Sequence, residues 1–167
     1  MTSLTLVEGL GPTAHDVVNT PDRFDAFLRT VHKIREANPK PLASIDEAFT
    51  RLRAQNPELS DDLGRFIATK STHTLADGAL HWRFDPLHRT SSPMPFQLAA
   101  FGAFLSRITA PTLYVCGEQG FRLPDEGARL TQIKQLTFRE YPAMGHMIHW
   151  FAAEALAADI TTFLATA

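Results

Sequence analysis

The chain of 167 residues (18.5 kDa) is 44% hydrophobic and 20% charged, a globular composition that excludes a disordered or fibrous protein. Its net charge of −2 gives no positive surface for nucleic acid or for an acidic membrane. A single cysteine, Cys116, excludes an internal disulfide and cysteine-based metal clusters. The N-terminus lacks the basic start of a signal peptide, and no apolar run approaches the roughly 18 residues of a membrane span. These features predict a cytoplasmic protein without a cofactor, a metal, a nucleic-acid partner or a membrane partner.

Residues 1–19 are expected to form one core strand followed by a loop. Leu4-Thr5-Leu6-Val7 is short and β-branched, and Gly9-Leu10-Gly11-Pro12 ends it. Because a strand must pair with a neighbour, a strand that opens the chain is expected to offer an exposed edge. A homodimer formed through that edge is therefore one predicted partner arrangement.

Residues 20–95 are expected to form a mainly helical region. Apolar residues repeat at helical spacing after each of three helix-start signals. The signals are Thr20-Pro21 as an N-cap and first-turn proline, the capping box Ser44-Ile45-Asp46-Glu47, and Ser60-Asp61-Asp62. The first helix is expected to stop before Asn38-Pro39. Asp77-Gly78 is a turn signal that predicts a small hairpin.

Residues 96–167 show a different pattern, in which strands and helices alternate. Pro111 to Cys116 is a continuous apolar run, typical of a parallel strand buried on both faces. The remaining expected elements are helices over 96–108, 124–133 and 150–164 and an alternating strand over 136–141. This order implies right-handed crossovers and an α/β fold with parallel strands.

The segment Ala143-Met144-Gly145-His146-Met147-Ile148-His149 is the most informative one for chemistry. It follows a strand and precedes the last helix, so His146 lies on a loop at the carboxyl end of a parallel strand. A histidine there can act as a general base, because its ordinary pKa of roughly 6.5 lies near neutrality. A loop histidine is also a common surface or packing residue, so this feature alone leaves both interpretations open.

The order of these motifs resembles the C-terminal part of the α/β-hydrolase fold family. In that family a proline-led strand ends in Gly-Glu, and a later strand ends in proline before a Gly-His loop and a final helix. The corresponding residues here are Ala110-Pro111 to Gly117-Glu118 and Tyr141-Pro142 to Gly145-His146. Residues 1–19 look like the strand that follows the nucleophile helix, and residues 20–95 stand where the family inserts its cap. The resemblance implies an incomplete α/β-hydrolase fold with a helical cap insertion.

The resemblance also implies roles for individual residues. His146 corresponds to the triad base, and His149 to a structural neighbour at the start of the last helix. The family commonly places its acid as Asp two or three residues after the glycine that corresponds to Gly117, where this chain has none. Some branches place it after the strand that corresponds to residues 4–7, so Glu8 is our first candidate for the acid and Glu118 the second. Each of them can equally be a solvated carboxylate at a strand end.

The nucleophile of the family is missing from this sequence. No G-x-S-x-G occurs, so no serine sits on a nucleophile elbow, and the oxyanion donors that accompany it are missing as well. Cys116 lies inside an apolar strand, where a buried structural cysteine is expected instead of a nucleophile. No His-x-x-x-His pair is expected on a helix, and His146 and His149, three residues apart, have no carboxylate nearby in the sequence to act as a third metal ligand.

Two functions remain as predictions. In the first, the chain belongs to a hydrolase of esters or similar small carbonyl compounds, acting on a small-molecule substrate. His146 is then the base, and the nucleophile comes from a lost N-terminal part, a separate polypeptide or sequence before a misassigned start. In the second, the chain is a non-catalytic remnant that serves as a binding or structural module. Under both, the isolated chain is expected to be inactive.

Overall fold

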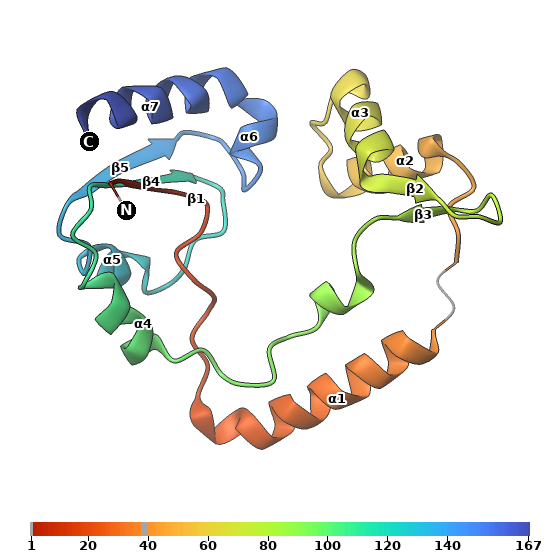
Figure 1. The fold of residues 1–167 in the computed structure, drawn as a ribbon, viewed down its shortest axis with the longest axis horizontal. Coiled ribbons are helices and arrows are strands. Elements are labelled where there is room, and N and C mark those ends of the chain that lie inside the picture. Colours follow the sequence, from red (N-terminus) through yellow and green to blue (C-terminus); the bar gives the residue numbers. More distant parts are fainter. Residues whose placement is uncertain (1, 38–39) are drawn as a thin grey trace. The chain divides into compact units, whose positions relative to one another are not determined.

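The structure is a computed structural model that describes residues 2–37 and 40–167 (Figure 1). It divides into two compact units, one built from residues 1–17 and 95–167 and the other from residues 18–94. The expected end of the first helix before Asn38-Pro39 falls partly outside the described residues, although α1 ends at Glu36. Each unit has its own hydrophobic core, so the two are described separately.

Unit 1 is built on a three-stranded parallel sheet with the strand order β1-β4-β5. Residues Val7 and Val115 are partners in the first pair of strands, and Val115 and Arg139 in the second. The described elements of the unit are β1 (Leu4–Val7), α4 (Leu98–Leu105), β4 (Thr112–Gly117), α5 (Glu126–Leu130), β5 (Leu136–Tyr141), α6 (Ile148–Phe151) and α7 (Ala153–Thr166). The sequence-based prediction of parallel strands joined by helices is confirmed.

Helices cover both faces of the central strand β4, all six residues of which are buried. Tyr114 and Cys116 point to one face, where they pack in a cluster with residues of α4 and the segments around α5. Leu113 and Val115 point to the other face and pack against α6 and α7. Because successive side chains of a strand alternate, the residues from Leu113 to Cys116 must be largely apolar to fill both cores. Figure 1 shows α7 and α6 on one side of the strands and α4 and α5 on the other.

Unit 2 combines helices with the short antiparallel hairpin β2-β3. Its described elements are α1 (Thr20–Glu36), α2 (Ile45–Gln55), α3 (Asp61–Ser71), β2 (Thr72–Thr74), β3 (Leu80–Trp82) and the 3-10 helix Pro86–Arg89, while a further 3-10 turn, Val17–Asn19, spans the boundary of the units. The core is small and gathers around Leu42, Ala48, Phe49 and Ala68. The predicted turn at Asp77-Gly78 lies between the two strands, and Gly78 adopts a φ of 85°.

Helix starts follow the sequence signals in two of the three cases. The Ser44 hydroxyl accepts the N–H of Glu47, whose carboxylate in turn accepts the N–H of Ala43 at 2.6 Å. The Ser60 hydroxyl accepts the N–H of Leu63 in the same way. The prediction of Thr20 as an N-cap was wrong, because α1 begins at Thr20 and Asn19 precedes it without a side-chain cap.

The helices of unit 1 differ from their predicted bounds. The closing helix was expected to begin at residue 150 and run unbroken, but it starts two residues earlier and is interrupted at Ala152, where φ is −134° and ψ is 39°. Helix α5 covers only five residues, because residues 131–135 form turns that lead directly into β5. These differences are local and leave the order of the elements unchanged.

One glycine marks the tightest packing in unit 2. A Cβ atom at Gly64 would lie 2.3 Å from the ring of buried Phe49 and 3.1 Å from Leu59. We expect Gly64→Ala to reduce the free energy of unfolding by about 1–3 kcal/mol through overpacking, measured by urea denaturation followed by circular dichroism. The matched control is Gly102→Ala in α4, where a Cβ meets nothing within 4 Å and should be neutral or stabilising. Equal effects of the two variants would contradict the packing explanation.

Candidate functional site

The carboxyl ends of the three parallel strands bring the predicted site residues to one edge of the sheet. Glu8 directly follows β1, Glu118 directly follows β4, and His146 lies five residues after the end of β5. Parallel strands end at the same edge, where side chains of separate segments can meet. The loops after the strands therefore decide which of these groups touch.

Glu8 has an unusual backbone conformation that turns its side chain into the protein. Its φ is 53°, in the left-handed region that residues other than glycine rarely occupy, at a cost on the order of 1–2 kcal/mol. The Glu8 N–H still donates to the Val115 carbonyl at 2.8 Å, so the residue remains tied to β4. Its side chain is only 4% exposed. A buried carboxylate in a strained conformation needs strong partners.

Three donors satisfy the Glu8 carboxylate. The N–H of Gly117 donates to Oε1, and the N–H of Phe121 donates to Oε2 at 3.3 Å. The third partner is Nδ1 of His146, 2.9 Å from Oε2. Because an ionised carboxylate can only accept, Nδ1 must carry the proton, which leaves the lone pair on Nε2 when the ring is neutral.

The other side of the His146 ring is open. Its side chain is 57% exposed, and Nε2 has no hydrogen-bond partner among residues 2–37 and 40–167. The loop that carries it is fixed to β4, because the Met144 carbonyl accepts the N–H of Gln119 at 2.9 Å. The fit is close: a Cβ atom at Gly117 would lie 2.3 Å from that same carbonyl oxygen. This close packing requires glycine at position 117. The packing of the loop against β4 also places the His146 ring beside Glu8.

Glu118, the other candidate for the acid, has a different partner. Its carboxylate accepts the N–H of Ala143 at 2.8 Å, and Ala143 has a left-handed φ of 56°. Glu118 therefore supports the loop that carries His146, and in the described part of the chain no hydrogen bond joins it to the ring. His149 is exposed in α6, where its ring lies 5.7 Å from that of Trp150. The structure thus brings together only Glu8 and His146 of the four residues.

Several contributors to this site were not found from the sequence. They are the backbone N–H groups of Gly117 and Phe121 and the close approach of Gly120, where a Cβ would lie 2.5 Å from both carboxylate oxygens of Glu8. Backbone donors leave no residue type to recognise. The spacing of the two glycines, Gly117-Glu118-Gln119-Gly120, was the one available signal.

A buried polar network anchors the far end of the loop that supplies these donors. Glu126 is 5% exposed and accepts the Tyr114 hydroxyl and the Arg122 Nε–H, both at 2.7 Å. Arg122 also pairs with Glu140 on β5. Two effects raise the pKa of Tyr114 far above its usual range: burial, which is the larger, and the hydrogen bond to Glu126. The hydroxyl therefore remains a donor. These contacts hold residues 118–125 against β4 and β5.

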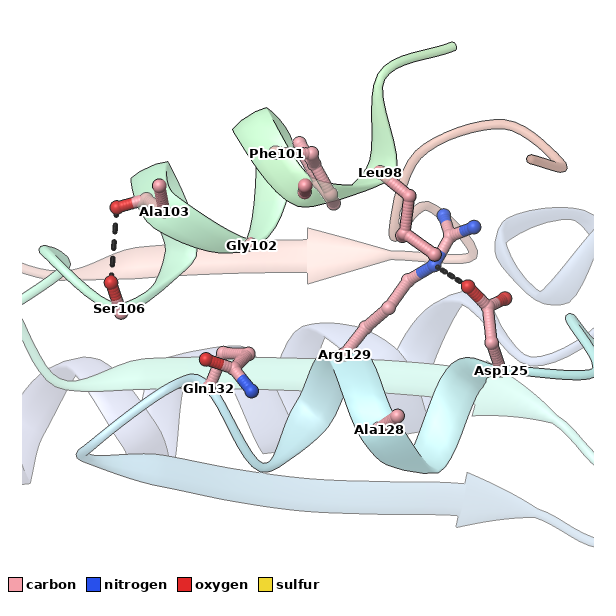
Figure 2. Close-up of a pocket in the computed structure, with 10 residues that line it drawn as sticks. Leu98, Phe101, Gly102, Ala103, Ser106, Asp125, Ala128, Arg129 and Gln132 are labelled. Atoms are coloured by element: carbon pink, nitrogen blue, oxygen red, sulfur yellow. Dashed lines mark hydrogen bonds and ion pairs between the residues drawn. The ribbon is translucent and has the colours of Figure 1, made fainter. Parts of the chain in front are cut away.

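A cavity of about 350 Å³ lies between α4 and α5, and it contains none of the predicted site residues (Figure 2). Arg129 lines it, pairs with Asp125 at 2.9 Å, and donates to the carbonyls of Leu10 and Pro12. Arg129 therefore secures the segment that follows Glu8. The Ser106 hydroxyl in this cavity donates to the Ala103 carbonyl, so it is engaged within its own helix.

The described residues offer no nucleophile in contact with the base. No serine hydroxyl in residues 2–37 and 40–167 hydrogen-bonds to His146, and Cys116 is 1% exposed in the core. Burial raises the pKa of the Cys116 thiol to about 11.

The part of the chain that the structure describes contains no group of three or more residues placed to hold a metal ion. Among the described helices, none has the length and apolar character that crossing a membrane requires.

The fold has counterparts among solved structures, although no family model and no curated protein matches the sequence. A hypothetical protein of Pseudomonas aeruginosa PAO1 is 22% identical with a TM-score of 0.81, over 98% of this chain and 58% of that one. The thioesterase domain from the curacin biosynthetic pathway is 25% identical with a TM-score of 0.72, over 96% and 58%. An esterase of Mycobacterium tuberculosis is 14% identical with a TM-score of 0.71, over 98% and 54%.

These similarities show the α/β-hydrolase fold. The chain is covered almost completely, whereas it spans less than two thirds of the length of each of these proteins. The fold of these neighbours and the part of their length that the chain spans confirm the sequence-based prediction of an incomplete α/β-hydrolase fold.

The contact between Gly120 and Glu8 can be tested directly. Gly120→Ala would push a methyl group against the carboxylate, so we expect the bond between Glu8 and His146 Nδ1 to be lost. Nitrogen-15 NMR of the imidazole ring should then show that Nδ1–H is no longer the dominant tautomer. Gly127→Ala in α5 is the control, since a Cβ there meets nothing within 4 Å. An unchanged His146 spectrum in Gly120→Ala would contradict the geometry described.

The burial of Cys116 gives a second prediction. With its pKa at about 11, the thiol stays protonated at pH 8, and we expect no reaction with iodoacetamide over an hour in the folded chain. Unfolding in urea should expose the thiol and allow one label per chain, detected by mass spectrometry. Rapid labelling of the folded chain would contradict the structural role assigned to this cysteine.

Proposed function

We propose that this chain supplies the general base and its orienting acid to a hydrolase of esters or similar small carbonyl compounds. The base is His146 and the acid is Glu8. The observation that carries the proposal is the 2.9 Å contact between His146 Nδ1 and the buried carboxylate of Glu8, with Nε2 left free. The nucleophile and the oxyanion hole come from sequence outside this chain, because G-x-S-x-G does not occur in it.

The geometry supports a mechanism in which His146 first takes up a proton and then returns it. Nε2 of His146 removes the proton from the nucleophile's hydroxyl as that oxygen attacks the substrate carbonyl. The ring is then an imidazolium, and the ionised Glu8 carboxylate stabilises it through Nδ1–H. As the tetrahedral intermediate collapses, Nε2 returns the proton to the departing alkoxide, and a water molecule later repeats the cycle to release the acid. Glu8 keeps its charge throughout.

The fold neighbours support the proposed class of substrate. One of them is a thioesterase domain and another is an esterase. A Ser-His-acid site acts on the acyl carbon of its substrate. The pair of Glu8 and His146 therefore suits a hydrolase of esters and related carbonyl compounds.

A second candidate function is a non-catalytic binding or structural module. It is favoured by the position of β1, which in the described residues pairs with β4 alone and so has an edge without a strand partner. A second copy of the chain pairing there would give a homodimer. Light scattering at micromolar concentration distinguishes this option, since a monomer counts against self-pairing.

Active-site labelling tests the absence of a nucleophile. We expect the chain alone to give no burst with an activated ester and no adduct with a serine-directed fluorophosphonate. A chain extended by the sequence encoded upstream should label at one serine if that segment contains G-x-S-x-G. Stoichiometric labelling of the isolated chain would contradict the proposal, and an upstream region without such a motif would favour the non-catalytic module.

Substitutions in the extended chain, assayed without the label, separate the two carboxylates. We expect His146→Ala and Glu8→Gln each to lower kcat by about 10³-fold or more, because one removes the base and the other removes the charge that fixes its tautomer. Glu118→Gln is the matched control, and it should lower kcat by about tenfold or less, since the Glu118 carboxylate accepts the N–H of Ala143 and has no hydrogen bond to His146 in the described residues. A larger loss in Glu118→Gln than in Glu8→Gln would reverse the assignment of the acid.

A further inference from the structure

Unit 2 contains a cavity that plays no part in the proposed hydrolase chemistry. Its volume is about 350 Å³. Basic and aromatic side chains dominate its walls, which are formed by Lys40, His73, Leu75, His81, Trp82, Phe84, Pro86 and Arg89. No carboxylate lines it in the part of the chain that the structure describes. Four groups that carry or can accept positive charge therefore surround one space.

Two of these groups are held side by side by the hairpin. His73 on β2 and His81 on β3 are direct partners in the antiparallel register, so their side chains extend from the same face of the hairpin. Both are partly buried, and neither ring has a hydrogen-bond partner among the described residues. Two neighbouring imidazoles without partners are free to donate to a ligand placed between them.

The aromatic wall positions a third group. The Arg89 guanidinium carbon lies 4.5 Å from the centroid of the Phe84 ring, so the cation is held over the ring face, and within residues 2–37 and 40–167 its N–H groups have no hydrogen-bond acceptor. Trp82 stacks against the same ring with centroids 6.0 Å apart and planes at 26°. The guanidinium is thereby positioned before any ligand binds, and the aromatic surface beside it can accept an apolar group.

Lys40 completes the basic set. It lies close enough to Glu47 for their charges to interact, but Glu47 already pairs with Arg51 at 2.5 Å and accepts the N–H of Ala43. The Lys40 ammonium is exposed and hydrogen-bonds to no group in residues 2–37 and 40–167. It remains available to the cavity.

We propose that this cavity binds a phosphoryl group carried on an aromatic or apolar ligand. A phosphoryl group has three acceptor oxygens and up to two negative charges, which match two imidazoles, a guanidinium and an ammonium better than a carboxylate with one charge does. A metal ion is disfavoured, because the described residues place no third ligand beside His73 and His81. Trp82 and Phe84 accommodate the organic part of the ligand.

Titration of the whole chain tests the proposal. The ligands are phenyl phosphate, inorganic phosphate, benzoate and phenol, followed at pH 6.5 by NMR of the histidine ring C–H groups and by calorimetry. We expect saturable shifts at His73 and His81 with phenyl phosphate, and binding at least tenfold tighter than that of benzoate. Equal affinity for inorganic phosphate would support the site and identify free phosphate as a sufficient ligand. No saturable shift with either phosphate would overturn the proposal, and so would equal affinity for benzoate or phenol.

Matched variants separate the cavity from general charge attraction. The double variant His73→Gln/His81→Gln and the single variant Arg89→Gln should each weaken phenyl phosphate binding by tenfold or more. The control variant His32→Gln/Lys33→Gln changes the same kinds of group at exposed positions of α1 outside the cavity. Its affinity for phenyl phosphate should stay within twofold of that of the unsubstituted chain. A similar loss in this control would overturn the proposal. Thermal melts identify any variant that fails to fold, and Phe84→Leu then tests the aromatic wall by a loss confined to phenyl phosphate.

Discussion

A buried carboxylate constrains the edge of the sheet in unit 1. Glu8 has 4% of its side chain exposed, and an ionised group in that position must have its oxygens hydrogen-bonded. Its donors come from two loops that are both distant from it in the chain: Gly117 and Phe121 at the end of β4 and just after it, and His146 after β5. Satisfying one carboxylate therefore fixes the end of β4, the loop after it and the loop after β5 at once.

The strained backbone conformations of unit 1 lie in the same loops. Glu8 and Ala143 are the two non-glycine residues with positive φ among the described residues, and both lie in the loops that meet here. Glu8 is held by the backbone of β4, and Ala143 is held by the carboxylate of Glu118. Each strained residue is thus compensated by a contact that also positions the Glu8–His146 pair.

The sequence predicted the elements better than it predicted the site. The continuous apolar run of β4 and the Gly-His loop are local patterns, and both were interpreted in their correct structural setting. The sequence ranked Glu8 before Glu118 as the acid but could not show which of them contacts the ring, because both follow strands that end at the same edge. In the described residues a left-handed φ turns Glu8 toward His146, whereas the Glu118 carboxylate accepts the N–H of Ala143. The helix break at Ala152 likewise has no signature of proline or glycine to reveal it.

Gly120 leads to a consequence for how such sites diversify. Its missing Cβ lies 2.5 Å from the Glu8 oxygens and 2.8 Å from the carboxyl carbon, so a short acidic side chain grown from position 120 would fill the same volume. Position 8 has a left-handed backbone, the conformation that glycine adopts without strain. The space occupied by the carboxylate therefore borders two segments of the chain, the residue after β1 and the loop after β4, and one of the two must stay without a side chain for the other to fill it.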